Sequence, residues 1–299
     1  MRLIRKGTVF ALGFFDGVHL GHQTILYACK RMADRAGLAT GAITFEDHPQ
    51  SLFTKNCPGL INTTADRCGL LRRYGVDTIL TYPVTPAVMG MPWRDFLMEL
   101  YRCYGAAGFV CGDDFRFGHK GEGNREKLAE FCREFGLECA IIPEQDLDGS
   151  RISSTRIRGF LERGDLENAN KLLGHPHILS GEVVPGRQLG RTIGIPTANL
   201  SFPEALQPLP YGVYACRAAV DGTEYMAVTN IGTRPTVAGD SVTVEPYLLD
   251  FSGDLYGKTI TLSFHKFLRP EKKFPTLTDL QLEIRKNIDQ TRNFFEKSE

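Results

Sequence analysis

Two histidines set among glycines form the first candidate site of this chain. Residues 13–22 read Gly-Phe-Phe-Asp-Gly-Val-His-Leu-Gly-His and lie between a predicted strand and a predicted helix. His19 and His22 are three residues apart, so at a helix start both rings can lie on one face. Gly17 and Gly21 let a backbone approach a ligand closely, and a helix N-terminus favours phosphate. The pattern predicts a phosphate site in which two imidazoles stabilise charge on a transferring phosphoryl group, although either histidine alone would be read as a capped or packed residue.

A second candidate segment, residues 152–158, carries hydroxyl side chains and two arginines at the predicted start of another helix. Ser154 and Thr155 precede Arg156 and Arg158. Hydroxyl residues at a helix start are commonly only caps. Hydroxyls and arginines together are also what a triphosphate tail requires. Because this segment follows the fifth predicted strand, we expect it at the same edge of the sheet as the histidines.

A third segment, residues 111–118, follows the fourth predicted strand and combines acids with aromatics. Asp114 and Phe115 lie at its centre. This composition suits a base or another flat ring, and a plain structured loop is the alternative interpretation.

The second half of the chain contains a glycine-rich segment with an arginine, at residues 186–199. Gly186, Gly190 and Arg191 imitate a Walker A loop but depart from it in spacing and in having Arg for Lys, and the Rossmann glycine fingerprint is also incomplete. Thr197 and Asn199 follow, and their oxygens are hard ligands suited to Mg²⁺. A glycine- and proline-rich turn capped by threonine and asparagine is the alternative.

The elements that must position these residues alternate in the first half of the chain. Short apolar strands are expected at 8–12, 39–45, 77–82, 107–111 and 138–142, with helices between them. Such alternation predicts βαβ units and a parallel sheet buried on both faces. Ligands bind at the carboxyl ends of the strands in such sheets, which is where the first three segments lie.

Beyond two further helices, at 154–162 and 165–173, the pattern changes to strands, and we place the domain boundary near residue 178. Strands are expected at 180–184, 212–220, 224–231, 241–251 and 258–264. Their lack of intervening helices predicts an antiparallel barrel or sandwich. A final helix begins near Thr276, where a capping-box pattern occurs. Its predicted apolar face consists of Leu277, Leu280, Ile284, Ile288 and Phe295.

Composition narrows the class of protein. The chain has 299 residues, which favours two domains. Its 35 basic and 35 acidic residues argue against a dedicated nucleic-acid or anionic-membrane binder. Eight cysteines at irregular spacing are expected to be reduced thiols. Apolar stretches stay below the roughly 18 residues of a membrane span, so a cytoplasmic protein is expected.

The order of the motifs resembles a known family. The patterns at residues 13–22, 44–49, 112–118 and 152–158 resemble the nucleotidyltransferase module of bacterial bifunctional FAD synthetases. The rest of the chain resembles the riboflavin kinase module of the same family. The segments that carry this second resemblance are 181–199, 210–214, 230–236, 244–245, 255–258 and 269–274.

The resemblance implies a Rossmann-like α/β nucleotidyltransferase domain over residues 1–178 and an antiparallel β-barrel riboflavin kinase domain with a C-terminal helix over 179–299. It implies that riboflavin is phosphorylated by ATP with Mg²⁺, and that the resulting FMN is adenylylated to FAD with release of pyrophosphate. The implied catalytic residues are His19, His22, Arg156 and Glu245. Implied contacts to nucleotide or flavin are made by Gly13, Phe15, Asp16, Gly17, Gly21, Asp114, Phe115, Ser154, Thr155, Gly186, Gly190, Arg191, Gly194, Pro196 and Asn230, and the implied metal ligands are Thr197 and Asn199.

Glu245 precedes Pro246, so it is expected in extended backbone at an edge or bulge. An acidic residue there is most often only solvated, whereas the resemblance implies that it is the base near the ribityl hydroxyl. Tyr247 stands where the family commonly has histidine, which puts the role of that neighbour in doubt.

Two alternatives remain at this stage. The first half alone also suits other small-substrate nucleotidyltransferases with the His-x-Gly-His pattern, but these do not account for residues 181–299. A non-catalytic nucleotide- or nucleic-acid-binding protein is the other alternative, and zero net charge counts against it. The expected partners are small molecules, with no nucleic acid and no membrane, and the oligomeric state is open.

Overall fold

The computed structural model describes residues 7–54, 56–186, 190, 194–236 and 239–297. The chain forms two compact units, residues 1–154 and 155–299. The division between these units falls at the start of a helix, before the expected domain boundary near residue 178. The expected domain boundary near residue 178 therefore stays a prediction.

The first unit is built on a five-stranded sheet in which every pairing is parallel. The order β3-β2-β1-β4-β5 brings the first strand to the centre, with its five residues all buried. This confirms the expected parallel sheet. The strands are β1 (Thr8–Leu12), β2 (Ala39–Phe45), β3 (Thr78–Tyr82), β4 (Ala106–Gly112) and β5 (Glu138–Ile142).

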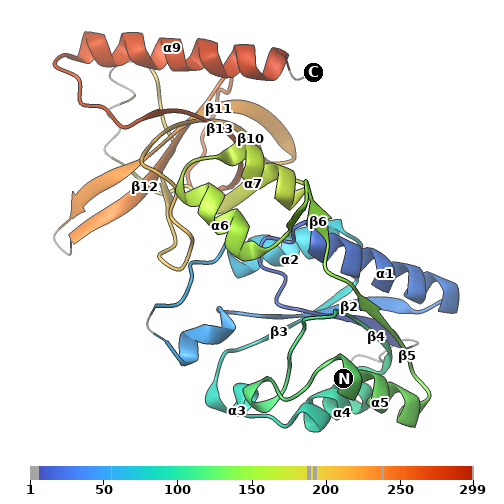
Figure 1. Cartoon of the computed structure of the whole chain (residues 1–299). Coiled ribbons are helices and arrows are strands. Elements are labelled where there is room, and N and C mark those ends of the chain that lie inside the picture. The colour runs from blue at the N-terminus through green and yellow to red at the C-terminus, as the bar shows by residue number, and fades with distance from the viewer. Residues whose placement is uncertain (1–6, 55, 187–189, 191–193, 237–238, 298–299) are drawn as a thin grey trace. The chain divides into compact units, whose positions relative to one another are not determined.

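Helices cover both faces of this sheet, as its apolar strands require. The helices α1 and α2 lie on one face, and α3, α4 and α5 lie on the other (Figure 1). Apolar side chains of α4 and α5 pack on the sheet in one core that includes Phe96, Phe109 and Phe131. The helices are α1 (Leu20–Ala36), α2 (Thr64–Arg73), α3 (Pro86–Met89), α4 (Trp93–Tyr104) and α5 (Arg125–Phe135), with 3₁₀ turns at Pro49–Leu52 and His119–Gly121.

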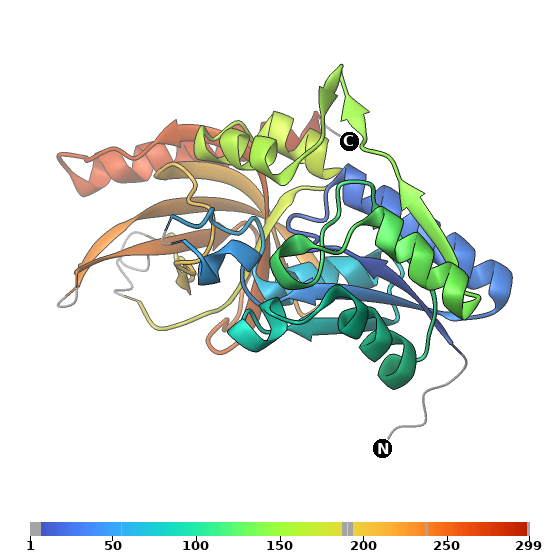
Figure 2. The same cartoon turned by 60° about the horizontal axis from the view of Figure 1, so that its bottom comes forward.

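A hairpin that was not expected follows the sheet. The strands β6 (Asp146–Leu147) and β7 (Ser150–Arg151) pair antiparallel around Asp148 and Gly149, both with positive φ. Consecutive residues of positive φ are typical of a tight hairpin turn. The hairpin continues beyond the end of β5 (Figure 2), and it leads into the segment that carries Ser154.

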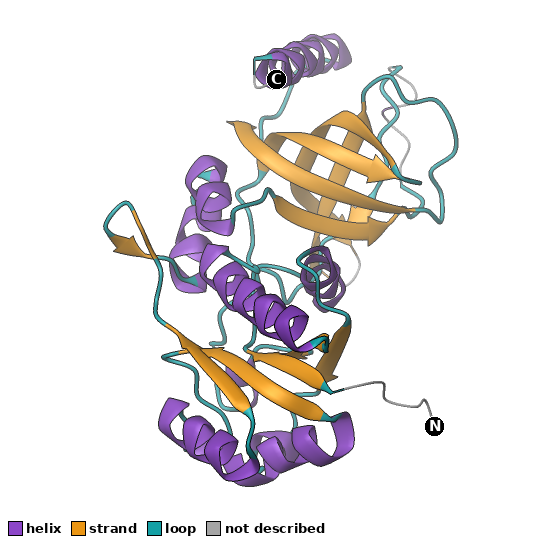
Figure 3. Ribbon diagram, turned by 90° about the vertical axis from the view of Figure 1, so that its right-hand side faces the viewer, coloured by secondary structure: helices purple, strands orange, loops and turns teal. Residues whose placement is uncertain are grey.

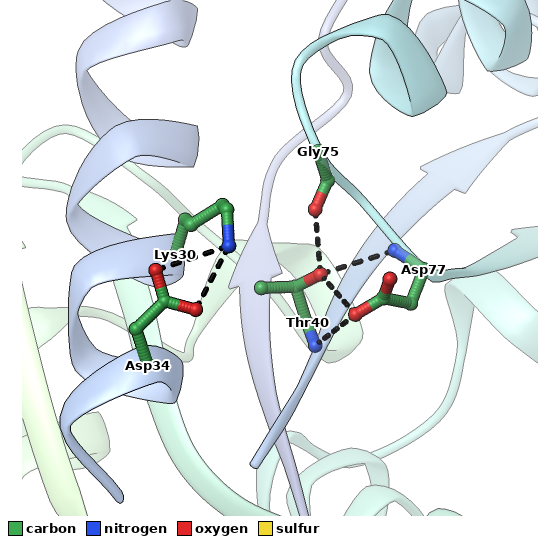
Figure 4. Close-up of polar contacts among 5 residues, drawn as sticks. All are labelled: Lys30, Asp34, Thr40, Gly75 and Asp77. Atoms are coloured by element: carbon green, nitrogen blue, oxygen red, sulfur yellow. Dashed lines mark hydrogen bonds and ion pairs between the residues drawn. The ribbon is translucent and has the colours of Figure 1, made fainter. Parts of the chain in front are cut away.

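A polar network ties β2 to the start of β3 (Figure 4). The buried Thr40 hydroxyl lies 2.7 Å from the Gly75 carbonyl oxygen and 2.8 Å from Oδ2 of Asp77, and it accepts from the Asp77 amide at 3.0 Å. The Thr40 amide donates to the same carboxylate at 2.9 Å. These bonds lower the pKa of Asp77. On α1, Lys30 and Asp34 form an exposed ion pair one turn apart at 2.8 Å.

The second unit is an antiparallel six-stranded sheet in the order β8-β13-β10-β11-β12-β9. Its two end strands come together, because the Val184 amide donates to the Asn199 carbonyl at 2.9 Å just beyond them. The sheet therefore closes into a barrel, as expected (Figure 3). The strands are β8 (His177–Glu182), β9 (Leu200–Ser201), β10 (Gly212–Val220), β11 (Thr223–Thr236), β12 (Gly239–Leu248) and β13 (Thr259–Pro270).

Three helices of this unit lie within the described residues. α6 (Ser154–Glu162) begins at the unit boundary, α7 (Leu166–Leu173) packs on β13 and β8, and α9 (Leu277–Glu296) packs on β10 and β11. The capping box of α9 is confirmed, since the Thr276 hydroxyl accepts from the Asp279 amide at 3.1 Å. Its expected apolar face is partly wrong, because Leu277 is 63% exposed.

The strand limits also differ from expectation around one hairpin. β11 continues to Thr236 and pairs with β12 through Gly239, beyond the predicted end at Ile231. Gly232 and Pro235 are weak strand formers, so the sequence predicted a loop there. Cross-strand pairing overrides that local preference.

No helix among the described residues is long and apolar enough to cross a membrane. All eight cysteines are free thiols.

Candidate functional site

The loop between β1 and α1 holds its residues in uncommon backbone conformations. Phe15 and Val18 have φ of 58° and 40°, and Gly17 lies between them at 82°. Positive φ is rare for residues other than glycine, above all for a β-branched one. Such strain collects at functional sites, where the surrounding structure maintains it. The phosphate-binding role that the sequence predicts for this loop stays a prediction.

The two predicted histidines lie against each other at the start of α1. His19 is the N-cap, and its Nδ1 accepts from the His22 amide at 3.3 Å. The rings stack with centroids 3.6 Å apart and 14° between their planes. A Cβ at Gly21 would lie 3.3 Å from the His19 ring, so glycine there permits the stacking. Because Nδ1 of His19 accepts, the neutral ring carries its proton on Nε2 and can donate to a ligand.

His22 is held as a neutral imidazole. Burial is the main cause that lowers the pKa of His22 well below its usual value, and His19 and Arg67 lower it further. The fully buried Phe15 ring meets the His22 ring edge to face at 5.3 Å. Phe15 therefore supports the histidine from inside the core, and the contact to a nucleotide that the resemblance implies stays a prediction. Nδ1 of His22 is enclosed and has no partner among the described residues.

Asp16 faces inward. Its Oδ1 accepts from the backbone amides of Ile61 and Asn62 at 2.9 and 3.4 Å, and the residue is 1% exposed. Its backbone carbonyl accepts from the Ser154 hydroxyl at 2.9 Å. The first and second predicted segments are thus brought together through Asp16 and Ser154. Gly13 lies beside them, where a Cβ would come within 2.9 Å of the Phe15 ring.

Arg67 is a residue of this site that the sequence analysis missed. It lies in α2, is fully buried, and stacks its guanidinium on the Phe14 ring with 4.6 Å to the centroid. Nη2 donates to the Phe45 carbonyl and, at 3.3 Å, to the Thr64 hydroxyl. Nε and Nη1 have no partner among the described residues. Burial lowers the pKa of Arg67, and the Asp16 carboxylate opposes that shift.

The third predicted segment lines an apolar cavity of about 350 Å³ in the first unit. Phe115 stacks on Phe117 with centroids 5.8 Å apart, and Asp114 pairs with Arg151 at the rim. Strand ends and the short α3 supply the other walls, as the carboxyl-end position predicts. The lining residues that the sequence did not single out include Val88, Met89 and Met91, whereas Phe14, Phe45 and Phe117 belong to the segments at 13–22, 44–49 and 111–118.

Thr155 and Arg156 lie in the first turn of α6. Thr155 is exposed, and the Arg156 guanidinium lies over the Phe160 ring with 5.7 Å to the centroid. Their part in binding phosphates stays a prediction.

The barrel unit has two cavities with a common wall. One of about 300 Å³ is lined by Glu245, Asn230 and Gly190, and another of about 330 Å³ is lined by Pro196 and the segment 251–256. Thr197 and Tyr247 line both. Two ligands bound in these cavities would therefore meet at Thr197 and Tyr247, beside the Glu245 carboxylate.

Glu245 lies on β12 directly opposite Asn230 on β11. Paired residues of adjacent strands point to the same face, and both line the 300 Å³ cavity. At the next position the Pro246 carbonyl accepts from the Ala198 amide at 2.9 Å, and β9 covers only Thr243 and Val244 of β12. The proline therefore occupies an edge of the ladder, as expected.

Each described glycine in the predicted segment at residues 186–199 is required for a different structural reason. A Cβ at Gly186 would lie 2.2 Å from Nδ2 of Asn199, and one at Gly190 would lie 2.1 Å from the Ile195 carbonyl oxygen. Gly194 has a φ of 70°. Arg191 lies outside the described residues.

The side-chain oxygens of Thr197 and Asn199 are chemically suitable ligands for a magnesium ion. Thr197 stands in the wall between the cavities, and Asn199 is buried against Gly186. A hydroxyl and an amide carbonyl are neutral oxygen ligands, which Mg²⁺ accepts when phosphates and water complete its shell. The described residues contain no cluster of three or more histidine, cysteine or acidic side chains that would hold a metal by itself.

Two family models match the chain in series. The model described as FAD synthetase matches residues 2–156, and the model described as riboflavin kinase matches residues 173–295. The helices α6 and α7 fall largely between the matched ranges.

Curated relatives extend this similarity over nearly the whole chain. Proteins described as bifunctional riboflavin kinase/FMN adenylyltransferase are 36% identical in Escherichia coli K12, over 97% of this chain and 94% of the relative, and 35% identical in Haemophilus influenzae, over 98% and 96%. The protein of that description in Listeria monocytogenes is 34% identical over 97% of this chain and 93% of its own length.

A solved structure shares the architecture. A protein from Streptococcus pneumoniae described as a macrolide-efflux protein superposes with a TM-score of 0.84 at 29% identity, covering 97% of this chain and 95% of its own. Its description names another activity than the family models do.

Proposed function

The chain belongs to the family of bifunctional riboflavin kinase/FMN adenylyltransferases, and from this premise we propose that its two units catalyse successive steps from riboflavin to FAD. The barrel unit transfers the γ-phosphoryl group of ATP to riboflavin, which gives FMN and ADP. The parallel-sheet unit transfers the adenylyl group of a second ATP to FMN, which gives FAD and pyrophosphate. Neither alternative reading of the sequence explains the second family match.

In the barrel unit we assign one substrate to each cavity. ATP occupies the cavity lined by Pro196 and residues 251–256, and riboflavin occupies the one lined by Glu245, so that the γ-phosphate and the terminal hydroxyl meet at Thr197. Glu245 takes the proton of that hydroxyl as its oxygen bonds to the γ-phosphorus and the bond to the β-phosphate oxygen breaks. The electron pair of the broken bond stays on ADP.

Magnesium would be held by Thr197 and Asn199 together with the phosphates of ATP. When bound, the ion neutralises charge on the transferring group. The glycines at 186 and 190 let this segment pack against Asn199 and Ile195, and Gly194 and Pro196 continue it to Thr197, so we assign the segment to the bound nucleotide.

In the parallel-sheet unit, an oxygen of the FMN phosphate attacks the α-phosphorus of ATP while the bond to the β-phosphate oxygen breaks. An ionised phosphate needs no strong base, so His19 and His22 act by donating hydrogen bonds to the charged oxygens. The lowered pKa of His22 keeps it a neutral donor at neutral pH. Ser154, Thr155 and Arg156 are assigned to the leaving pyrophosphate.

The isoalloxazine ring of FMN is assigned to the 350 Å³ cavity. Phe115 and Phe14 offer flat apolar surfaces there, and Asp114 lies at the rim. Flat aromatic walls favour a stacked ring. The proposed partners are these small molecules, and a cytoplasmic location stays a prediction from the cysteine usage.

The observation that carries the proposal is the serial match of two family models to two units that each hold cavities of ligand size. The test is one incubation of the protein with riboflavin, excess ATP and Mg²⁺, with the flavins separated over time. We expect FMN to rise first and then to give way to FAD. If neither riboflavin nor added FMN is converted, the proposed function is wrong.

A further inference from the structure

The carboxylate of Glu271 reaches across a strand of the barrel at a glycine. A Cβ built on Gly232 would lie 2.6 Å from Oε1 of Glu271 and 3.3 Å from Nδ2 of Asn230. The Glu271 amide donates to the Tyr211 carbonyl at 3.2 Å, which ties this segment to the start of β10. The carboxylate and the Asn230 amide therefore share the space above Gly232.

This space belongs to the cavity assigned to riboflavin. On β11, Asn230 and Gly232 are two residues apart and so point to the same face. Their partners on β12 are Glu245 and Thr243. Glu271, Asn230 and Glu245 all line the 300 Å³ cavity. A second carboxylate thus stands on the same wall as the proposed base, one residue pair further along the strands.

The cavity offers both apolar and polar surface. Val213, Val228 and Ile284 are among its apolar lining residues, and its polar lining residues include Asn230, Glu245 and Glu271 as well as the cations Arg269 and Lys272. A flat ring suits apolar surface, and the hydroxyls of a ribityl chain suit oxygen acceptors. A carboxylate is an acceptor, and its hydrogen bonds to hydroxyl donors are the strong, charge-assisted kind.

We propose that Glu271 is a substrate-binding residue that accepts hydrogen bonds from inner hydroxyls of the ribityl chain, and that Gly232 is required because the carboxylate occupies the space of its side chain. Binding in this way fixes the chain so that its terminal hydroxyl faces Glu245. The inference rests on the proposed kinase function of the barrel unit.

The test measures riboflavin phosphorylation by the full chain with four variants: Glu271→Ala, Glu271→Gln, Gly232→Ala and the double variant Gly232→Ala/Glu271→Ala. We expect Glu271→Ala to raise KM for riboflavin by about tenfold, the effect of losing a hydrogen bond to a charged group, with a smaller change in kcat. Glu271→Gln retains an acceptor oxygen and is expected to lose less. Gly232→Ala is expected to raise KM similarly, because the added methyl group displaces a flexible carboxylate.

The double variant separates this cause from general damage. Once Glu271 is alanine, the methyl group at 232 has no carboxylate to displace, so the double variant is expected to match Glu271→Ala within about twofold. Matched controls are Glu204→Gln, an exposed carboxylate that lines neither barrel cavity, and Gly181→Ala, whose Cβ would meet only ordinary contacts at 3.5 Å and beyond. Thermal unfolding of each variant reports on the fold.

A flavin analogue identifies the interacting group. In 10-(5-hydroxypentyl)isoalloxazine with the ring methyls retained, the terminal hydroxyl remains and the inner hydroxyls are absent. We expect Glu271→Ala to change KM for this analogue less than about twofold. Equal effects on riboflavin and the analogue, or effects of Gly232→Ala and Glu271→Ala that multiply, would overturn the inference. A wild-type chain that leaves riboflavin unphosphorylated would instead refute the proposed function.

Discussion

The histidine site and the barrel site differ in how far the fold already buries their polar side chains and holds them in place. In the parallel-sheet unit His19, Asp16 and Arg67 are between 0% and 6% exposed, and each has a polar side-chain atom hydrogen-bonded to the backbone. In the barrel unit Glu245 is half-buried and faces a cavity, and Pro196 is exposed.

The difference follows from the proposed reactions. An attacking phosphate is already ionised, so its site needs fixed donors that do not reorganise during transfer. A hydroxyl must lose a proton, so its site needs a base that substrate can reach. The polar groups of the enclosed site are therefore already fixed by the fold, whereas we expect the open site to be completed only when substrate binds. The predictions below test this contrast.

The largest effect is expected at the base. Replacing Glu245 by alanine removes the proton acceptor and is expected to reduce riboflavin phosphorylation by about 10²- to 10⁴-fold. Conversion of supplied FMN to FAD is expected to stay near the wild-type rate. Both rates are measured on the same preparation by flavin chromatography. A parallel fall in both would show that the variant damages the fold.

The reciprocal change is expected at the histidine pair. Replacing His19 by alanine removes both a hydrogen-bond donor and the N-cap of α1, and we expect FAD formation from FMN to fall about 10²- to 10³-fold. Phosphorylation of riboflavin serves as the internal control. FAD formation near the wild-type rate would disprove the stabilising role of this residue.

A smaller effect is expected beneath the histidine loop. Replacing Arg67 by methionine removes a buried cation that has two donors without described partners, so we expect the free energy of unfolding to change by less than about 1 kcal/mol. FAD formation is expected to fall about tenfold, because Phe14 loses the cation over its ring and Asp16 loses the positive charge that interacts with its carboxylate.

The pKa of His22 gives this variant a readout beyond activity. Because Arg67 lowers the pKa of His22, its removal is expected to raise that pKa, and the acidic limb of FAD formation moves to higher pH. Titration of the His22 ring by NMR measures the shift directly. Arg72→Met, an exposed arginine on the same helix, is the matched control, and an unshifted His22 would rule out the electrostatic role.

The smallest effect on catalysis is expected from a residue that takes no part in either proposed reaction. Replacing Thr40 by valine removes the hydroxyl that joins β2 to Gly75 and Asp77 (Figure 4), and we expect a loss of about 1 to 3 kcal/mol in the free energy of unfolding. Catalytic rates below the unfolding transition are expected to be unchanged. Chemical denaturation measures the loss, and a changed FAD rate in the native baseline would contradict the purely structural role.

The sequence predicted the parallel sheet closely because its strands are short apolar runs with clear breaks. Strands such as Ala39–Phe45 and Glu138–Ile142 have the expected limits. The hairpin β6–β7 and the strand β9 have two residues per strand, which is too short for any periodicity to appear. β11 extends past Gly232 and Pro235 because pairing with β12 outweighs their local preference.

In the candidate sites, the polar motifs were easier to predict from the sequence than the buried residues that pack against them. The histidine pair and the joining of Asp16 to Ser154 agree with the expected common edge of the sheet. Arg67 was missed because an arginine in an amphipathic helix is read as part of a solvated face, and only tertiary contacts bury it. For Phe15 the reverse occurred. The resemblance implied a ligand contact for this residue, but the structure buries its side chain completely in the core.

The wall formed by Thr197 and Tyr247 has a consequence for inhibitor design. Because the same two side chains line both barrel cavities, the proposed occupants of these cavities are expected to be neighbours. A flavin linked covalently to an adenine nucleotide through a phosphate-like bridge would fill both cavities as one molecule. It would lose translational freedom once instead of twice, so its affinity is expected to exceed that of either half by the effective concentration of the link.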